Sequence, residues 1–387
     1  MPKESIVFSM EIKLTPVIDF GKMPIANAFL TPDEFATEYF YQMVVGFDPA
    51  TKAIGLVNRV PPEKMFHGQY AFFSSTSKSM QAHFRATAEK LLPYAGSGLV
   101  VEMGSNDGIM LEAWKELGVQ AVGVEPSANV AAASRGRGHR VIERFMDDRA
   151  ADEILGNGSV SLVYGANVSC HIEDFVNYAR LIARLIGKSG VFVFEDPYFL
   201  DIVDKTSYDQ IYDEHVWYFT ISFINNIFSQ FGYHVFDCEH IDVHGGELRM
   251  YVGHKDTHTV TPSVSEWLAK EADLPAKLEL LKANIIHSKS AMQKLLRGLK
   301  VDLHSKIAFP FITFIVMLIG APLAMRTGRA SAMVGVGTSL FVVVLYYTVH
   351  SVCMAMGKGG HLPPPLAAWF GNIIFAAVGI YLIKNSA

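Results

Sequence analysis

The residues most suited to holding a ligand follow a short apolar stretch, Leu99–Met103, which is typical of a buried strand. Glu102 lies near the end of this stretch, and Gly104 and Gly108 follow it four residues apart. Glycine is needed where the backbone turns tightly and a ligand comes close, because a Cβ would block both. The spacing differs from the Gly-x-Gly-x-x-Gly fingerprint of dinucleotide sites. It predicts another kind of cofactor-binding turn, which leads into a helix.

A second acid supports this prediction. Glu125 follows the next apolar run, Ala121–Val124, and lies 21 residues after Gly104. A carboxylate in this place can accept hydrogen bonds from both hydroxyls of a ribose. Together, the acid-x-Gly-x-x-x-Gly turn and the second acid resemble the motifs of class I S-adenosylmethionine (SAM) methyltransferases. The resemblance implies SAM as the cofactor and a cofactor site that contains Glu102, Gly104, Ser105, Asn106, Gly108, Glu125 and Asn167.

Six strings, taken in order, resemble the deoxysugar C-methyltransferase family. They lie at residues 23–30, 73–78, 104–108, 124–130, 211–215 and 244–249. The resemblance extends over about residues 16–300. It implies methyl transfer from SAM to a ring carbon next to a ketone on a nucleotide-linked keto-deoxysugar.

The resemblance assigns the catalytic role to Tyr212, Glu214 and His215. Methylation of a carbon next to a ketone needs a base for the C–H proton and a donor that holds the enolate oxygen. A histidine, with an ordinary pKa of about 6.5, suits the base, and Tyr212 suits the donor. Glu214 could be the base if burial raised its pKa, or it could orient the histidine. Without the resemblance, one face of a helix with an ordinary surface histidine is the favoured explanation of the run.

The substrate pocket implied by the resemblance contains Tyr70, Ser75, Lys78, His171 and His244. A solvent-exposed side chain explains Lys78 equally well. Asn167 and His171 follow the apolar run at residues 159–164, where substrate meets cofactor in such sheets. The N-cap of a helix explains Asn167 almost as well.

Two features depart from the family. Its members carry cysteine pairs, interpreted as a zinc site, around the segment at residues 23–30, whereas the first cysteine here is Cys170. The three cysteines, Cys170, Cys238 and Cys353, form no closely spaced pair, so no metal is expected. The family also continues into a second Rossmann-like domain, but here the sequence changes character after about Val301.

Short apolar runs alternate with amphipathic stretches over residues 79–255, a pattern typical of a parallel sheet covered by helices. Runs at 98–103, 121–124, 159–164 and 190–194 predict strands, and runs at 233–238 and 247–252 predict an antiparallel pair. The expected fold class is α/β: a seven-stranded, Rossmann-like class I SAM methyltransferase sheet. We expect a small β-rich domain over residues 1–78, the methyltransferase domain over 79–255, a helical linker over 256–303 and a membrane segment over 304–387.

The membrane prediction depends on charge and length. Residues 307–387 contain four basic residues and no acid, so the formal charge of −5 becomes −9 on residues 1–306. Uncharged runs of 19, 27 and 22 residues lie at 307–325, 330–356 and 362–383. A transmembrane helix needs about 20 apolar residues. Three such helices, with the lipid bilayer as partner through residues 307–383, are therefore expected. No basic stripe predicts a nucleic-acid partner.

The tail resembles a second family at residues 303–310, 320–324 and 362–364: the last three helices of the lipopolysaccharide-export permeases. Those permeases have six helices, so partner transmembrane helices would complete the bundle. Basic residues favour a methyltransferase domain on the cytoplasmic side of the inner membrane, six against three. The permease orientation would instead place it in the periplasm. This conflict leaves two alternatives open: a permease-like fragment, or a non-functional chimera.

Overall fold

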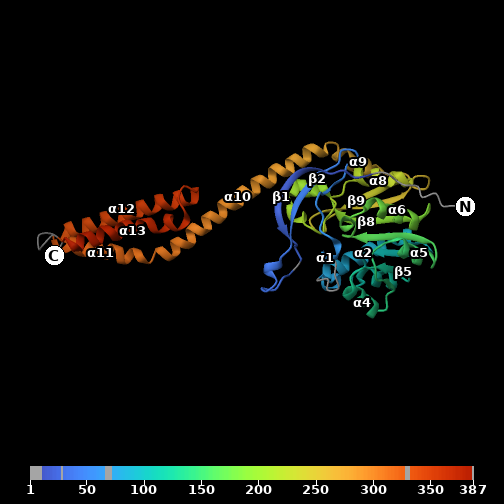
Figure 1. Ribbon diagram of the computed structural model, residues 1–387, viewed down its shortest axis with the longest axis horizontal. Coiled ribbons are helices and arrows are strands. Elements are labelled where there is room, and N and C mark those ends of the chain that lie inside the picture. Colours follow the sequence, from blue (N-terminus) through green and yellow to red (C-terminus); the bar gives the residue numbers. More distant parts are fainter. Residues whose placement is uncertain (1–10, 28, 66–71, 327–331, 386–387) are drawn as a thin grey trace. The chain divides into compact units, whose positions relative to one another are not determined.

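The computed structural model describes residues 11–27, 29–65, 72–326 and 332–385. The chain divides into two compact units, Met1–Ala283 and Asn284–Ala387. Strands and short helices make up the first unit, and long helices make up the second (Figure 1).

The first unit is built on a seven-stranded sheet, as predicted. Its strand order is β6-β5-β4-β7-β8-β10-β9. Five neighbouring strands are parallel, and β10 runs antiparallel to both β8 and β9. The strands are β4 (Leu99–Met103), β5 (Ala121–Val124), β6 (Val141–Ile142), β7 (Val160–Ala166), β8 (Val191–Pro197), β9 (Tyr233–Ile241) and β10 (Glu247–His254). The expected antiparallel pair is confirmed, while the two-residue β6 had not been predicted.

The side chains of β8 show how this sheet is covered on two faces. All seven residues of the strand are buried, as expected for a strand that has helices on both sides. Val191 and Val193 belong to the core that α2 (Lys78–Ala95) and α3 (Ile109–Glu116) form on one face. Phe192 and Phe194 alternate with them and contact aromatic rings of α6 (Phe175–Ile186), α8 (Ile221–Phe228) and the segment before α8.

The other helices of this unit connect the strands or follow the sheet. They are α1 (Pro62–Met65), α4 (Ala128–Gly136), α5 (Asp148–Leu155), α7 (Phe199–Lys205) and α9 (Pro262–Lys270). Polar side chains begin several helices: Asp147 accepts a hydrogen bond from the Ala150 amide of α5 at 2.7 Å, and Asp174 accepts one from the Asn177 amide of α6 at 3.0 Å.

A second, three-stranded antiparallel sheet forms the β-rich N-terminal part. Its strands are β1 (Thr15–Pro24), β2 (Phe40–Phe47) and β3 (Ile54–Leu56), in that order. The last of these bonds to the segment before α8: the Leu56 amide donates to Val216 O at 2.8 Å, and the Tyr218 amide donates to Ile54 O at 2.9 Å. The small sheet therefore helps to hold the segment that follows Tyr212, Glu214 and His215.

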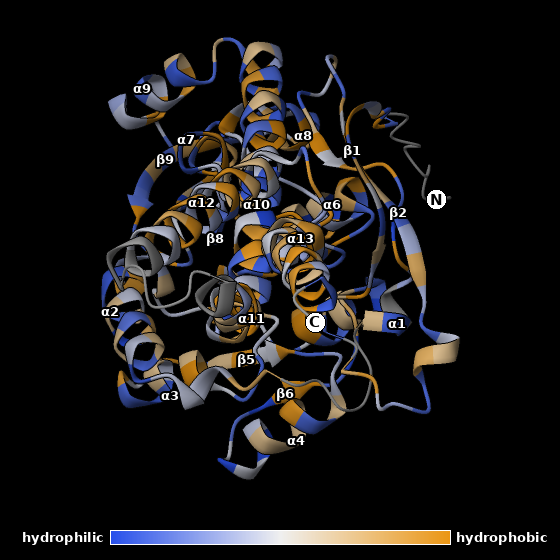
Figure 2. Ribbon diagram, turned by 90° about the vertical axis from the view of Figure 1, so that its left-hand side faces the viewer, coloured by the Kyte–Doolittle hydropathy of each residue, from blue (hydrophilic) through white to orange (hydrophobic). Residues whose placement is uncertain are grey.

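The second unit consists of the end of α10 (Leu274–Ala308), α11 (Phe311–Arg326), α12 (Ala332–Gly359) and α13 (Pro364–Lys384). Ile312, Ile315 and Ile319 of α11 pack with Tyr346 and Phe375 of the two following helices. Figure 2 colours α11 and α13 predominantly as hydrophobic.

Two described helices, Gly337–Gly359 and Pro364–Lys384, are long and apolar enough to cross a membrane. The number becomes three if Leu274–Ala308 and Phe311–Pro322, which meet at 51°, are one broken span. The predicted first span, residues 307–325, is thus interrupted. The chain breaks before Phe311, next to Pro310, because proline disfavours helical geometry in the residue before it. Pro322 lies inside α11.

Candidate active site

The glycine turn has the backbone geometry that the sequence predicted. Gly104 and Gly108 have φ of +61° and +86°, a region that residues with a Cβ rarely adopt. A Cβ on Gly104 would overlap the Val168 side chain, and one on Gly108 would overlap Ser134 and His139. Gly108 is also the N-cap of α3. Both glycines are therefore required by conformation and by space.

Glu125 lies at the end of β5 and lines the cavity next to this turn. Its Oε2 accepts a hydrogen bond from the Asn106 amide at 3.0 Å, and its Oε1 accepts one from the Ser127 amide at 2.7 Å. Burial raises the pKa of this carboxyl, and the two amides oppose that rise. Each carboxylate oxygen has a second lone pair. The side chain can therefore accept further hydrogen bonds from a diol.

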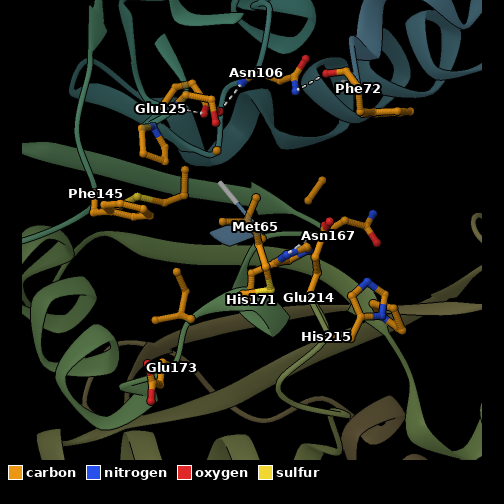
Figure 3. A pocket seen from close by; sticks show the side chains of 18 of the residues that line it. Met65, Phe72, Asn106, Glu125, Phe145, Asn167, His171, Glu173, Glu214 and His215 are labelled. Atoms are coloured by element: carbon orange, nitrogen blue, oxygen red, sulfur yellow. Dashed lines mark hydrogen bonds and ion pairs between the residues drawn. The ribbon is translucent and has the colours of Figure 1, made fainter. Parts of the chain in front are cut away.

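Asn106 connects the turn to the segment that precedes α2. Its Oδ1 accepts the Ser74 amide at 3.0 Å, and its Nδ2 donates to Phe72 O at 3.1 Å (Figure 3). Next to it, Ser75 donates its amide to Asp107 Oδ1 at 3.1 Å and hydrogen-bonds the same carboxylate through its hydroxyl. The Asn106 side chain thus holds neighbouring backbone in place beside the cavity that it lines.

Three residues assigned to cofactor binding lie behind the cavity wall. Glu102, Ser105 and Gly108 are not among the residues that line the cavity, and the first two are buried. Burial, followed by the nearby Glu125 and Asp107, raises the pKa of Glu102 well above its ordinary value. The Glu102 carboxyl thus lies beneath the turn, where burial disfavours its charged form.

The cavity has a volume of about 1130 Å³. It lies between the carboxyl ends of the parallel strands and the segment that connects β1 to β2 in the small N-terminal sheet. Figure 3 shows Glu125 and Asn106 at one end and His171, Glu214 and His215 at the other. Sequence reasoning missed Arg144, Phe145 and Met146, which line the cavity directly after β6. A two-residue strand gives no periodicity from which to find them.

The segment around His215 is a turn and not a helix, so the alternative of a surface helix face is wrong. His215 is buried, its Nδ1 lies 2.8 Å from Gln210 O, and its Nε2 lies 3.2 Å from the Tyr212 hydroxyl. Because a carbonyl can only accept, Nδ1 carries the proton of the neutral ring and Nε2 has the lone pair. Burial lowers the pKa of His215 to about 4. The imidazole is therefore neutral and able to accept a proton at neutral pH.

Glu214 is held between the two sheets of the first unit. Asn27 donates its Nδ2 hydrogen to Glu214 Oε1 at 2.7 Å, and the Ala26 amide donates to Asp213 Oδ1 at 3.0 Å. His171 Nδ1 lies 3.8 Å from Glu214 Oε2. Burial raises the pKa of Glu214, and the Asn27 hydrogen bond opposes the rise. Asn27 belongs to a string that carried the family resemblance, yet the string alone assigned it no role.

Asn167, His171 and His244 also line the cavity. Asn167 has φ of +53° directly after β7, while Asp174 caps the next α-helix, so the N-cap interpretation of Asn167 is wrong. Burial, and then the neighbouring His215, lowers the pKa of His171 to about 3. Burial also lowers the pKa of His244.

The remaining residues assigned to the substrate lie elsewhere. Ser75 is absent from the cavity lining and bonds Asp107, because its segment is held against the glycine turn. Lys78 begins α2 with an exposed side chain, which agrees with the alternative interpretation. Tyr70 lies outside the described residues.

Family comparisons match three parts of the chain. Residues 8–66 match a family described as a putative zinc binding domain, residues 78–237 match a methyltransferase domain, and residues 234–385 match the lipopolysaccharide export system permease LptF/LptG. The permease match begins inside β9, which the structure places in the seven-stranded sheet.

Individual proteins show the same likeness. The C-methyltransferase NovU of Streptomyces niveus is 30% identical over 261 residues, which are 66% of this chain and 62% of that protein. The chain thus spans less than two thirds of the relative. A putative methyltransferase of Haloferax volcanii, in complex with its activator Trm112, is 16% identical with a TM-score of 0.36, over 46% of this chain and 94% of its own. Magnesium protoporphyrin IX methyltransferase of Synechocystis with bound SAH is 13% identical with a TM-score of 0.36, over 45% and 83%.

The zinc described for the first family does not fit this chain. Residues 8–66 contain neither cysteine nor histidine, the two side chains that structural zinc sites use. The small sheet is instead held by its backbone bonds to residues 216–218 and by the Asn27–Glu214 hydrogen bond. The chain thus has a Rossmann-like sheet over residues that match a methyltransferase domain, and a C-terminal part that matches the LptF/LptG permease. The segment before the sheet matches a putative zinc binding domain but lacks cysteine and histidine.

Proposed function

We propose that this chain is a SAM-dependent C-methyltransferase that acts next to a ketone on a nucleotide-linked deoxysugar. One observation carries the proposal: Glu125, an acid placed to bind a ribose, and His215, a buried base, line the same cavity. Single ligands usually occupy pockets of about 300–1,000 Å³. A cavity of about 1130 Å³ has room for a cofactor beside part of a second ligand.

In this proposal Glu125 accepts hydrogen bonds from the ribose of SAM, and Gly104 lets the cofactor approach the backbone of the turn. Phe145 and Met146 add apolar surface at the same end of the cavity. Asn167 lies between the two ends, after β7. The bound cofactor would supply an electrophilic methyl group.

Side chains of the protein then accept the substrate proton and stabilise the negative charge of the enolate. His215 Nε2 takes the proton from the carbon next to the ketone, and the electron pair of that C–H bond forms the enolate. The Tyr212 hydroxyl lies 3.2 Å from Nε2. When substrate binds, it turns and donates a hydrogen bond to the enolate oxygen. The enolate carbon would then take the methyl group that bound SAM supplies, and the sulfur would keep the electron pair of its methyl bond. Glu214, held by Asn27, lies 3.8 Å from His171 Nδ1, next to the same part of the cavity.

Glu125→Ala is expected to weaken SAM binding by about 1–3 kcal/mol, because the hydrogen bonds to the ribose hydroxyls are lost. Calorimetry with the full chain in detergent measures this directly. Glu116→Ala is the matched control, since that acid is exposed and pairs only with Arg85 among the ion pairs of the described residues. Equal affinity of both variants and the wild type would contradict the proposed cofactor site.

For the membrane part we keep the domain boundaries predicted from the sequence. Residues 307–383 anchor the chain in the inner membrane. The methyltransferase domain lies in the cytoplasm, where SAM is made. The apolar helices and the permease match support membrane association. The permease match also favours a second candidate function: a permease-like fragment that needs partner transmembrane helices and whose soluble part is passive. Binding of SAM distinguishes the enzyme from this candidate and from a non-functional chimera.

A chain that ends after Lys300 is expected to leave the membrane fraction and to retain SAM binding. This cut falls inside α10 and not between two helices. It remains a suitable place, because no side chain from Ile286 to Lys300 is buried, and Val301 begins the next buried stretch. Fractionation and calorimetry test both halves of the expectation. Aggregation of the shortened chain, beside a well-behaved full chain, would show that the two units depend on each other.

A further inference from the structure

Three possible metal ligands meet at the inner end of the cavity. Cys170 and His171 belong to a short 3-10 turn, Ser169–His171, and His215 belongs to the segment before α8. One ligand atom from each side chain lies within 4.8 Å of the other two. Zinc bonds of about 2.0–2.3 Å place tetrahedral ligand atoms about 3.5 Å apart, so each atom would move by only about 1 Å.

The His215 ring is already arranged as metal-bound histidines usually are. Its Nδ1 donates to the backbone carbonyl of Gln210 at 2.8 Å, which fixes the tautomer and leaves the lone pair on Nε2, where the Tyr212 hydroxyl lies at 3.2 Å. The rings of His171 and His215 meet edge to face, with centroids 5.3 Å apart. Burial keeps both rings neutral at neutral pH, because it lowers the pKa of each well below 6.5. No proton therefore needs to leave either ring before a metal binds.

The thiol has a neighbour that can accept its proton. Cys170 is buried, and its amide donates to Asp196 Oδ1 at 3.1 Å. Burial raises the pKa of Asp196 to about 7. Burial and the adjacent Asp196 also raise the pKa of the thiol, so the free site holds a neutral S–H. When a divalent cation forms a bond to sulfur, the thiol proton can pass to Asp196 or to solvent.

We propose that Cys170, His171 and His215 form a binding site for a soft divalent cation such as Zn²⁺. Thiolate sulfur and imidazole nitrogen are both ligand types that zinc binds. Glu214 Oε2, 3.8 Å from His171 Nδ1, is a carboxylate oxygen near enough to serve as a fourth ligand. The bound ion uses the same Nε2 that takes the substrate proton, so it acts as an inhibitor. This last consequence depends on the proposed function, whereas the binding itself does not.

Co²⁺ titration of the full chain in detergent tests the site, because cobalt bound to a thiolate gives a strong near-ultraviolet charge-transfer band. We expect a band that saturates at one Co²⁺ per chain and disappears when Zn²⁺ is added. Cys170→Ser should lose it. Cys238→Ser is the matched control, since it removes another buried cysteine of the same unit and should leave the band unchanged.

A missing band, or a band that survives in Cys170→Ser, would overturn the proposed site. The inhibition is tested separately: Zn²⁺ should reduce methyl transfer by wild type at least tenfold, and Cys170→Ser should restore most of it. Equal inhibition of the two proteins would overturn the inhibitory role. If the metal-free protein transfers no methyl group while the Cys170-dependent band is present, the proposed function fails and the metal site stands.

Discussion

His215→Ala is expected to lower turnover at least about 100-fold while the affinity for SAM stays unchanged, in line with the usual contribution of a general base. The ring lies at the opposite end of the cavity from Glu125, so its loss should not disturb the cofactor (Figure 3). Steady-state kinetics and calorimetry on the same preparation measure the two quantities. Glu214→Gln is the comparison, because it removes the charge of the neighbouring acid and keeps its shape.

The pH profile identifies the base. Since burial lowers the pKa of His215 to about 4, the ring stays unprotonated and active down to that pH. The acid limb of kcat/KM should therefore fall near pH 4 and not near the 6.5 of an exposed histidine. Burial raises the pKa of Glu214 above its ordinary value, so a glutamate base would place the limb at higher pH. If Glu214→Gln is inactive and His215→Ala is nearly normal, the two roles are reversed.

The sequence was sufficient for the central strands because nearly all of their residues are buried. A strand such as β8, with helices on both faces, must be apolar at every position, and that pattern is visible without a structure. β6 and β1 give no comparable pattern: the first has two residues, and only one side chain of the ten-residue second strand is buried. The cavity residues after β6, including Phe145, were missed for this reason.

The site was predictable where local backbone geometry determines it, and less so where distant segments meet. The glycine turn depends on residues within one loop, and its left-handed glycines are confirmed. Asn27 and Glu214 are 187 residues apart, and nothing in their spacing shows that one holds the other. Ser75 and Cys170 show the same limit: the first was assigned to substrate but bonds Asp107, and the second lies next to His215 only through the fold.

Gly104→Ala is expected to abolish measurable SAM binding. The residue has φ of +61°, where a Cβ costs about 1–2 kcal/mol, and the added carbon would overlap the Val168 side chain. Val168 lies directly before Ser169–His171, so its displacement would disturb both the cofactor turn and the turn that carries His171. Calorimetry with the full chain, beside a thermal melt that confirms folding, measures the effect.

Gly118→Ala is the control that separates backbone strain from steric overlap with a neighbouring side chain. Gly118 has φ of +72°, and a Cβ added to it would meet no heavy atom within 4 Å, so alanine there has the same backbone strain in open space. This variant should bind SAM normally. Adding Val168→Ala to Gly104→Ala removes the overlapping methyl groups and leaves the Val168 Cβ at 3.3 Å, so part of the affinity should return. If Gly104→Ala binds SAM as well as Gly118→Ala does, the turn is not the cofactor site. The methyltransferase proposal for this cavity would then be wrong, because Glu125 and His215 would share a pocket that SAM does not enter.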